Sequence, residues 1–594
     1  MPLFRPVLTR GRLRTMPVLR HTAALVLLGL IGCAAPTATH RSLADGSGRA
    51  LATAAPIDLE RPSAAGDYLV GRIALDEGDL ATAVKHFALA LKAAPDNPEL
   101  RRQLFLLQLV AGDFDAALAA APQLGTEADT EEAKLVLALE AVRRGDYATA
   151  RARFDQLGGR GVSGLAAPLF RAWAAFGAGD RDAALALTRA GGAAEGLGQL
   201  RRYHEAAMLG LAGRPADGAT QLRAEVTDDA PTALRILLTL AALQVEAGHR
   251  AEAVDVLQRQ SGLAGDAPAL AALAEAVARG AEVPRPIRDA RSAMADLLLG
   301  LGEALSEQRA GSQGLLFARL ATWLEPDLPE AWLLIGRIES NQERYGSAVQ
   351  ALAQVPASSL LAWPAALARA DALASAGDEA AAQKLLREMA DRRPADTTAL
   401  RQLGDLHRRA ERYEQAERAY GEAIARLVEP ATEDWRLFYA HGVALERLKR
   451  WPEAETYLLR ALELSPDQPI VLNYLGYSWV DQGVHLDRAK GMLHRAVELR
   501  AEDGFIVDSL GWAYFRLGDF EQATIYLERA VELEPGDAVI NDHLGDAYWR
   551  VGREREARFQ WQRALSLKPE ADAVADIESK LRDGLPAVRG AGRG

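Results

Sequence analysis

Small and apolar residues recur along the chain at intervals of about 34 residues, most clearly near the C-terminus. Each interval there contains a Leu-Gly pair, a Tyr three residues later, two Ala positions flanking a bulky residue, and a Pro. A fixed period of this length predicts stacked copies of one small structural unit. Three of these landmarks advance together by one period: Gly511 to Gly545, Ala523 to Ala557, and Pro535 to Pro569.

The landmarks predict a pair of helices in each unit. Ala, Leu, Arg and Glu are abundant throughout, and these residues favour helix. A Gly on the first helix and Ala on the second allow the two helices to approach closely, and the bulky residue fills the space between them. The Pro ends the second helix, because it lacks the N–H that another turn requires and clashes with the preceding turn.

The pattern resembles that of the tetratricopeptide repeat family, and the resemblance implies an all-α, right-handed superhelical solenoid. A degenerate copy near Gly302 and Pro326 brings the expected number of helix pairs to about fourteen. The first Ala position of the other copies falls at Ala83, Ala117, Ala150, Ala184, Gly218, Ala253, Ala348, Ala382, Ala416, Ala454, Ala489, Ala523 and Ala557.

The turn inside each pair has its own signature, a Gly followed by an Asp. We expect the Gly to end the first helix in the left-handed conformation and the Asp to cap the first N–H groups of the second helix. The signature occurs at Gly78-Asp79, Gly112-Asp113, Gly145-Asp146, Gly179-Asp180, Gly377-Asp378 and Gly518-Asp519.

The repeats are not uniform. The step from Ala416 to Ala454 is longer than the others and indicates an insertion near residues 428–434. The repeat phase is lost after Ala253, where Pro284 and Pro286 interrupt any clean helix pair. We therefore predict a signal peptide at 1–32, a tether at 33–63, an N-terminal repeat array at 64–262, an irregular break at 263–290, a C-terminal array at 291–570, and a capping helix with a frayed tail at 571–594.

The first residues carry the marks of an export signal. Five Arg lie between residues 5 and 20, and residues 23–31 form an apolar run. A basic segment before a run this short is typical of a secretory signal rather than a membrane span. Translation begins at Met1 or at Met16, since the residues after Met16 also make an adequate basic segment. The Ala-, Thr-, Ser-, Gly- and Pro-rich stretch that follows reads as a flexible tether.

The apolar run ends at Leu30-Ile31-Gly32-Cys33, and Cys33 is the only Cys in the chain. This end resembles the lipobox of bacterial lipoproteins, in which the Cys is acylated and becomes the mature N-terminus. The resemblance implies a lipid anchor, because two or more acyl chains hold a protein stably on a membrane. Ala34 follows rather than Asp, which favours the periplasmic face of the outer membrane. The alternative is that Cys33 is an incidental small residue of a cleaved peptide.

Composition and motifs exclude several functions. The net charge is −12, and removal of the five Arg of residues 1–32 makes it −17 (−12 − 5). A chain with this negative charge is unfavourable for nucleic-acid binding, which requires clustered Lys and Arg. The chain has no phosphate-binding glycine loop and no HExxH zinc motif. Because repeats occupy nearly all of the mature chain, we expect neither a catalytic domain nor a cofactor or metal site.

The family resemblance also indicates where a partner binds. In such solenoids the first helix of each pair lines the concave face, and aromatic and Arg side chains dominate protein-binding hot spots. Asp481 and Phe505 also fall on this face. The alternative is that its aromatic side chains pack between neighbouring repeats and are not available to a partner. The predicted partner-binding residues are Asn473, Tyr477, Asp508, Trp512, Phe515, Arg516, Asp542, Asp546, Trp549 and Arg550.

Residues 469–569, behind a lipobox, are more specifically similar to envelope repeat lipoproteins that bind carboxyl-terminal-processing proteases. This similarity implies a non-enzymatic adaptor that brings a periplasmic protease together with substrates that remodel the cell wall. The alternative is a scaffold or pilot lipoprotein of an exopolysaccharide or secretin export machine. The segments that carry the similarity begin at Asn473, Asp508 and Asp542 and each contain Leu-Gly.

Overall fold

The structure is a computed structural model that describes residues 63–586, apart from short gaps at 125–129, 159–160, 191–196, 228–229, 264–266 and 309–310. The predicted signal peptide, Cys33 and nearly all of the tether lie outside the described residues. Within the described ranges the regular structure is helical, with no strand, and fourteen helix pairs follow one another. This confirms the predicted all-α repeat fold. None of the described helices combines the length and apolarity that a membrane span requires.

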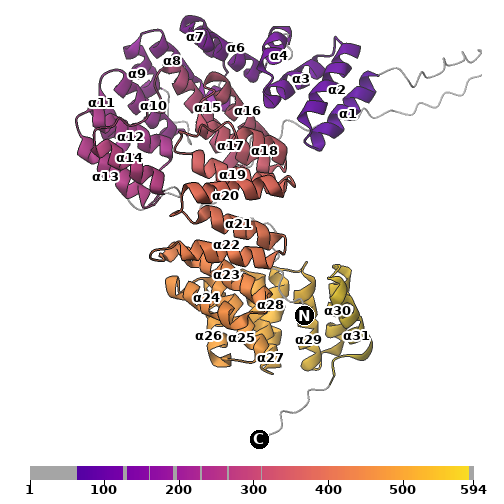
Figure 1. Ribbon diagram of the computed structural model, residues 1–594. Helices are drawn as coiled ribbons and strands as arrows, with labels where there is room; N and C mark the ends of the chain where they lie inside the picture. The colour runs from indigo at the N-terminus through magenta and orange to yellow at the C-terminus, as the bar shows by residue number, and fades with distance from the viewer. Residues whose placement is uncertain are drawn as a thin grey trace, which may run out of the picture. The chain divides into compact units, whose positions relative to one another are not determined.

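Helices that adjoin in the sequence pack side by side, as Figure 1 shows. Before residue 280 there are six pairs followed by one single helix. In chain order these elements are α1 (Ala64–Asp76), α2 (Leu80–Ala93), α3 (Pro98–Ala111), α4 (Phe114–Ala120), η1 (Ala121–Gln123), α6 (Glu131–Arg143), α7 (Tyr147–Phe154), α8 (Gly161–Gly177), α9 (Arg181–Ala190), α10 (Gly198–Leu211), α11 (Pro215–Arg223), α12 (Leu234–Glu246), α13 (Arg250–Ser261) and α14 (Ala267–Ala278).

Eight further pairs and a final single helix complete the described chain. The short 3₁₀ helix η2 lies in the insertion predicted near residues 428–434. The elements are α15 (Ala290–Glu307), α16 (Gly311–Leu324), α17 (Pro329–Asn341), α18 (Tyr345–Leu352), α19 (Ala362–Ser375), α20 (Glu379–Arg392), α21 (Thr398–Arg409), α22 (Tyr413–Ala425), η2 (Thr432–Asp434), α23 (Trp435–Arg447), α24 (Trp451–Leu464), α25 (Pro469–Gln482), α26 (Leu486–Leu499), α27 (Gly504–Arg516), α28 (Phe520–Leu533), α29 (Ala538–Arg550), α30 (Glu554–Ser566) and α31 (Ala571–Asp583).

The joints inside the pairs form as the sequence predicts. Gly518 has a φ of +83°, and Asp519 accepts a hydrogen bond from the backbone N–H of Gln522 at 3.2 Å. The first Ala position, such as Ala523, is fully buried. A Cβ at Gly545 would lie 2.5 Å from the ring of Trp561, so only Gly permits this approach of the two helices.

The segment predicted to be an irregular break contains one helix. Residues 267–278 form α14, which packs on α13, and residues 279–289 lack helix. Pro284 and Pro286 lie in this short non-helical stretch, where they remove no helical hydrogen bond. The loss of repeat phase thus coincides with one additional single helix and a non-helical connection to α15.

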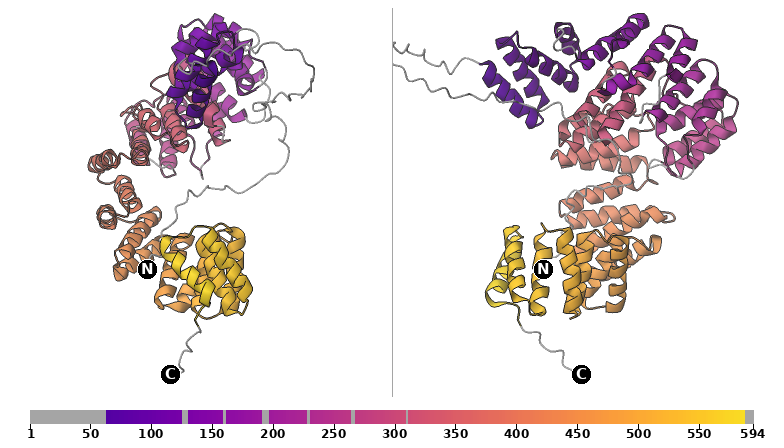
Figure 2. Two further views of the ribbon diagram at one scale, coloured as in Figure 1. Left: turned by 90° about the vertical axis from the view of Figure 1, so that its right-hand side faces the viewer. Right: turned by 180° about the vertical axis from the view of Figure 1, so that it is seen from behind.

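The pair α15–α16 packs against helices that are distant in the sequence. α15 contacts α8 and α10, and α16 contacts α3 and α6. In Figures 1 and 2 this pair, coloured rose, lies beside the indigo and purple helices of the first repeats. The predicted boundary between two separate arrays therefore does not hold, since a single core of buried residues extends from Phe105 to Ala351.

Aromatic and charged contacts hold the first repeats to α16. The ring of Phe114 stacks on Trp323 with centroids 5.0 Å apart, and the Arg143 guanidinium lies 4.6 Å from the centroid of the same Trp. Arg319 on α16 pairs with the fully buried carboxylate of Glu339 at 2.9 Å, which fixes α16 to the following helix, α17. By contrast, the repeats after α18 have small separate cores, as expected where each repeat contacts only its neighbours.

Candidate partner-binding surface

The first helices of the solenoid differ in what covers them. Those of the early repeats, α3, α6, α8 and α10, pack against α15 or α16. In the last repeats the equivalent helices are α25, α27 and α29, and they carry all ten predicted binding residues. The accessible part of this surface therefore depends on how these three helices pack on one another and on α31.

Trp512 lies at the centre of this surface and is half-buried. Its indole stacks on Phe515, with ring centroids 4.7 Å apart, and on His543, with centroids 4.0 Å apart. Phe515 belongs to the same helix, α27, whereas His543 belongs to α29. Trp512 therefore joins two successive first helices and still presents part of its ring to solvent.

Two predicted residues beside Trp512 are buried, so the expectation that they face an open surface was wrong. Asp508 is 8% exposed, because its carboxylate is hydrogen-bonded to Nδ1 of His543 at 3.0 Å. Tyr477 is 6% exposed, and burial is the main cause that raises its pKa above the ordinary value. Asn473 is partly exposed, and its side-chain oxygen has no hydrogen-bond partner within the described chain.

The charge on His543 depends on its acidic surroundings. Burial disfavours the protonated imidazole, but the carboxylate of Asp508, assisted by Asp542 and Asp546, outweighs burial and raises the pKa of His543. The imidazolium and Asp508 then form a buried ion pair between α27 and α29. This polar contact is structural, and it leaves neither group available to a partner.

Arg516 is exposed as predicted, but it already has a partner. Its guanidinium contacts the carboxylate of Asp481 on α25 at 2.7 Å and the backbone oxygen of the same residue at 3.1 Å. An exposed ion pair of this kind contributes little to stability. Arg516 is therefore free to exchange Asp481 for an acidic group of a partner at small cost.

The capping helix covers the first helix of the last repeat. The ammonium group of Lys580 on α31 lies 2.9 Å from Asp542 and 3.0 Å from Asp546. Burial opposes the charge on Lys580, yet these two carboxylates outweigh burial and raise its pKa. Asp546 is 4% exposed and also accepts a hydrogen bond from Trp561. Both Asp side chains therefore bind the capping helix through Lys580. This corrects the expectation that they line an open surface.

Residues 584–586 partly cover Trp549 and Arg550. Gly584 lies directly against the Trp549 indole, since a Cβ at this Gly would overlap the ring. The Arg550 guanidinium donates a hydrogen bond to the backbone oxygen of Pro586 at 2.7 Å. Both side chains keep partial exposure, but residues 584–586 cover part of the surface on which they were predicted to lie.

One feature of this surface escaped the sequence-based prediction. Ile470, Phe505 and Val539 are each the second residue of a first helix, and they are 44%, 42% and 47% exposed. Each precedes the repeat Gly by six residues, so the three form a row of equivalent positions across α25, α27 and α29. The sequence-based prediction placed only Phe505 on this face, although the position six residues before the repeat Gly could have identified all three. We call this row, together with Trp512 and Phe515, the C-terminal docking face.

The chemistry of this face is that of protein recognition. Partly exposed rings and aliphatic side chains bordered by an Arg are typical of interface hot spots. Across the described parts of the chain, His, Cys, Asp and Glu side chains do not gather in any group of three that would hold a metal ion.

Comparison with known proteins identifies the repeats. Two family models described as tetratricopeptide repeat match residues 401–469 and 508–537. The TPR repeat-containing protein PA4667 of Pseudomonas aeruginosa is 30% identical over 196 residues, which is 32% of this chain and 32% of that protein. The alignment thus covers about a third of the relative. The two matched stretches are thus tetratricopeptide repeats, and repeats of this kind typically form scaffolds for protein–protein interaction.

Solved structures of helical-repeat proteins are also similar. A chain of the APC/C hetero-tetramer Cut9-Hcn1 aligns over 88% of this chain and 96% of its own length, with a TM-score of 0.36 and 15% identity. YrrB, a TPR protein with an unusual peptide-binding site, aligns over 33% of this chain and 97% of its own, with a TM-score of 0.27 and 18% identity. MamA AMB-1 aligns over 28% and 96%, with a TM-score of 0.25 and 25% identity.

Proposed function

We propose that this protein is a lipid-anchored adaptor at the periplasmic face of the outer membrane. In this role it brings a periplasmic protease together with substrates that remodel the cell wall, and it catalyses no reaction itself. The observation that carries the proposal is the C-terminal docking face, where exposed apolar residues recur on three successive first helices. Residues 469–569, which resemble protease-binding envelope lipoproteins, contain this entire face.

The position of Cys33 supports the anchor. It is the only Cys of the chain and follows directly on the apolar run of a signal-like segment. Acylation at this residue places the solenoid on a membrane surface and leaves the repeats free to bind soluble partners. The acidic charge of the chain favours protein partners over nucleic acid.

The proposal is tested by reconstitution. The purified full-length protein is added to a carboxyl-terminal-processing protease of the same envelope, with a cell-wall hydrolase as the substrate. We expect faster cleavage of the hydrolase, and we expect Phe505→Asp to weaken protease binding by about 30-fold, the effect of losing a hot-spot residue.

A matched control separates docking from folding. Ile525 on α28 is an apolar side chain with 57% exposure that lies outside the docking face. Ile525→Asp should leave both protease binding and stimulation unchanged. If the protein neither binds nor stimulates the protease but copurifies with a secretin or an exopolysaccharide porin, the export-scaffold alternative replaces the proposal.

A further inference from the structure

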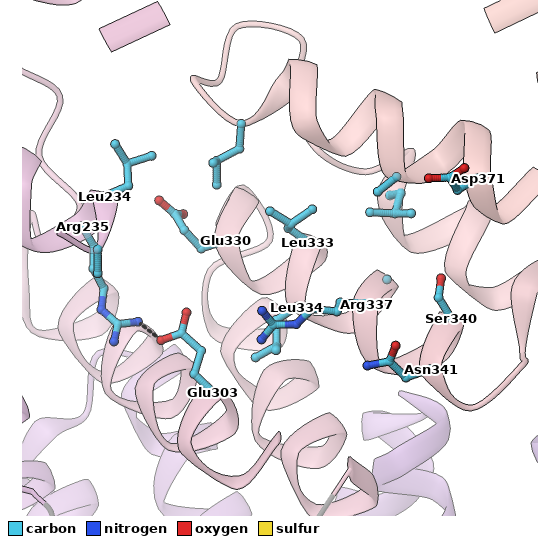
Figure 3. Close-up of a pocket in the computed structure, with 15 residues that line it drawn as sticks. Leu234, Arg235, Glu303, Glu330, Leu333, Leu334, Arg337, Ser340, Asn341 and Asp371 are labelled. Carbon is cyan, nitrogen blue, oxygen red and sulfur yellow. Dashed lines mark ion pairs between the residues drawn. The ribbon is translucent and has the colours of Figure 1, made fainter. Parts of the chain in front are cut away.

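A pocket of about 530 Å³ lies far along the chain from the C-terminal docking face, where α12, α15, α17 and α19 meet. Figure 3 shows the side chains that line it. Pockets of this size are large enough to hold a ligand or a short stretch of peptide. We call it the central pocket, and its long wall is the first helix α17, which contributes residues from Glu330 to Asn341.

The wall formed by α17 has a charge of opposite sign at each end. Glu330, Leu333, Leu334 and Arg337 are spaced so that they lie on one face of the helix. In Figure 3 Leu333 lies beside Glu330, and the guanidinium of Arg337 lies beside Leu334. Seven residues of helix separate the Cα atoms of Glu330 and Arg337 along the axis by about 10 Å.

The Glu330 end of the pocket carries an excess of negative charge. Arg235 of α12 forms an ion pair with Glu303 of α15 at 2.6 Å, drawn as the dashed line in Figure 3. This Arg balances one carboxylate, and Glu330 has no ion-pair partner among the described residues. Burial is the main cause that raises the pKa of Glu330, as expected for a carboxyl group without a direct counter-charge.

The other end of the pocket carries an unpaired positive charge. Arg337 is exposed and makes no ion pair within the described part of the chain. The acidic residue that lines this end, Asp371, is already paired with Arg409 at 3.3 Å. Ser340 and Asn341 supply neutral hydrogen-bonding groups beside Arg337. An incoming carboxylate therefore finds a free guanidinium here.

We propose that the central pocket binds an extended segment of a partner protein in which a basic and an acidic residue flank an aliphatic one. The basic side chain pairs with Glu330, the aliphatic side chain lies on Leu333 and Leu334, and the acidic side chain pairs with Arg337. Nucleic acids and anionic lipid headgroups are poor occupants, because their negative charges would be repelled at the Glu330 end. This second surface allows the scaffold to hold two proteins at once, whichever protein occupies the C-terminal docking face.

The probe for this inference is a phage-displayed library of random dodecapeptides, selected on the intact protein. For the wild type we expect an enriched pattern of Lys or Arg, an aliphatic residue, and Asp or Glu. In Arg337→Glu both ends of the pocket are acidic, so the enriched pattern should change to a basic residue on both sides of the aliphatic one. A synthetic peptide of the wild-type pattern should bind Arg337→Glu about fivefold or more weakly.

Controls make the result specific to the pocket. Arg279→Glu reverses the charge of a 71% exposed Arg directly after α14, outside the pocket, and should leave the enriched pattern unchanged. Thermal midpoints of both variants should equal that of the wild type, because neither Arg is buried. A photo-crosslinking version of the selected peptide should label α17 or α19. The inference is overturned if the pattern is the same on wild type and Arg337→Glu, if no peptide is enriched, or if the label falls on α27.

Discussion

The imidazole of His543 stacks on the indole of Trp512, with ring centroids 4.0 Å apart and an angle of 14° between the ring planes. Because Nδ1 of the same imidazole contacts Asp508, α27 and α29 are joined by an aromatic stack and an ion pair at one point. Residues that the repeat pattern assigns to a docking surface are thus also contacts between repeats. Substitutions here affect both stability and binding, and the two effects must be measured separately.

Replacing Trp512 tests the stack. Trp512→Ala should lower the free energy of unfolding of the last repeats by about 2 kcal/mol, less than the roughly 3–5 kcal/mol expected for a fully buried ring, because part of the indole is exposed. Urea unfolding followed by circular dichroism gives the value. Arg516→Ala, which removes only an exposed ion pair, should change it by less than about 1 kcal/mol. If Trp512→Ala lowers the free energy of unfolding no more than Arg516→Ala does, the aromatic stack contributes nothing to stability.

The raised pKa of His543 predicts a dependence of stability on pH. The folded state binds a proton on His543 more tightly than the unfolded chain does. The stabilisation is therefore complete below the ordinary pKa of about 6.5 and is lost as the pH rises through the higher folded-state pKa. We expect the thermal midpoint of the wild type to fall across this window more than that of His543→Gln. Parallel pH profiles of the two proteins would contradict the assigned charge.

Lys580 is expected to hold the cap on the last repeat. Lys580→Met leaves Asp542 and Asp546 facing each other without a counter-charge, and breaking a buried ion pair by removing one partner costs about 3–5 kcal/mol. Amide hydrogen exchange should accelerate in α29–α31 and stay unchanged in α17–α20. Adding Asp546→Asn should recover part of the protection, whereas a further loss would rule out charge repulsion as the cause.

Trp323 is expected to fasten the first repeats to α16. Trp323→Ala removes both the stack on Phe114 and the contact with Arg143. We expect faster amide exchange in α3 and α6 with little change in α27–α30, because repeats far apart in a solenoid are energetically independent. Phe559→Ala, at a position with 64% exposure on α30, is the matched control and should leave α3 and α6 protected.

The anchor is tested by fractionation. Cys33→Ser removes the thiol that would be acylated, so the protein should leave the membrane fraction or remain as an unprocessed precursor. Wild-type protein should carry a radiolabelled fatty acid and the variant should not. A wild type that fractionates as soluble and takes up no label would show that Cys33 is not an anchor.

The local structural features of the repeats could be predicted from the sequence. The Gly-Asp turns, the buried Ala positions and the capping helix after Pro569 occur where the pattern placed them. Each of these features depends on residues a few positions apart, through left-handed glycine, capping by Asp, or close helix approach at Gly545. Interactions of such short range are encoded by spacing alone.

The tertiary structure decided which of the repeated surfaces are still open. Phe114 and Trp323 meet because the chain between them brings α15–α16 back to the first repeats. No local sequence pattern predicts this contact between distant repeats. Asp546 is a surface position by its place in the repeat, but Lys580 of the next helix buries it. The repeat pattern defines equivalent positions, whereas exposure at each position depends on what packs against it, and that is set by contacts between residues distant in sequence.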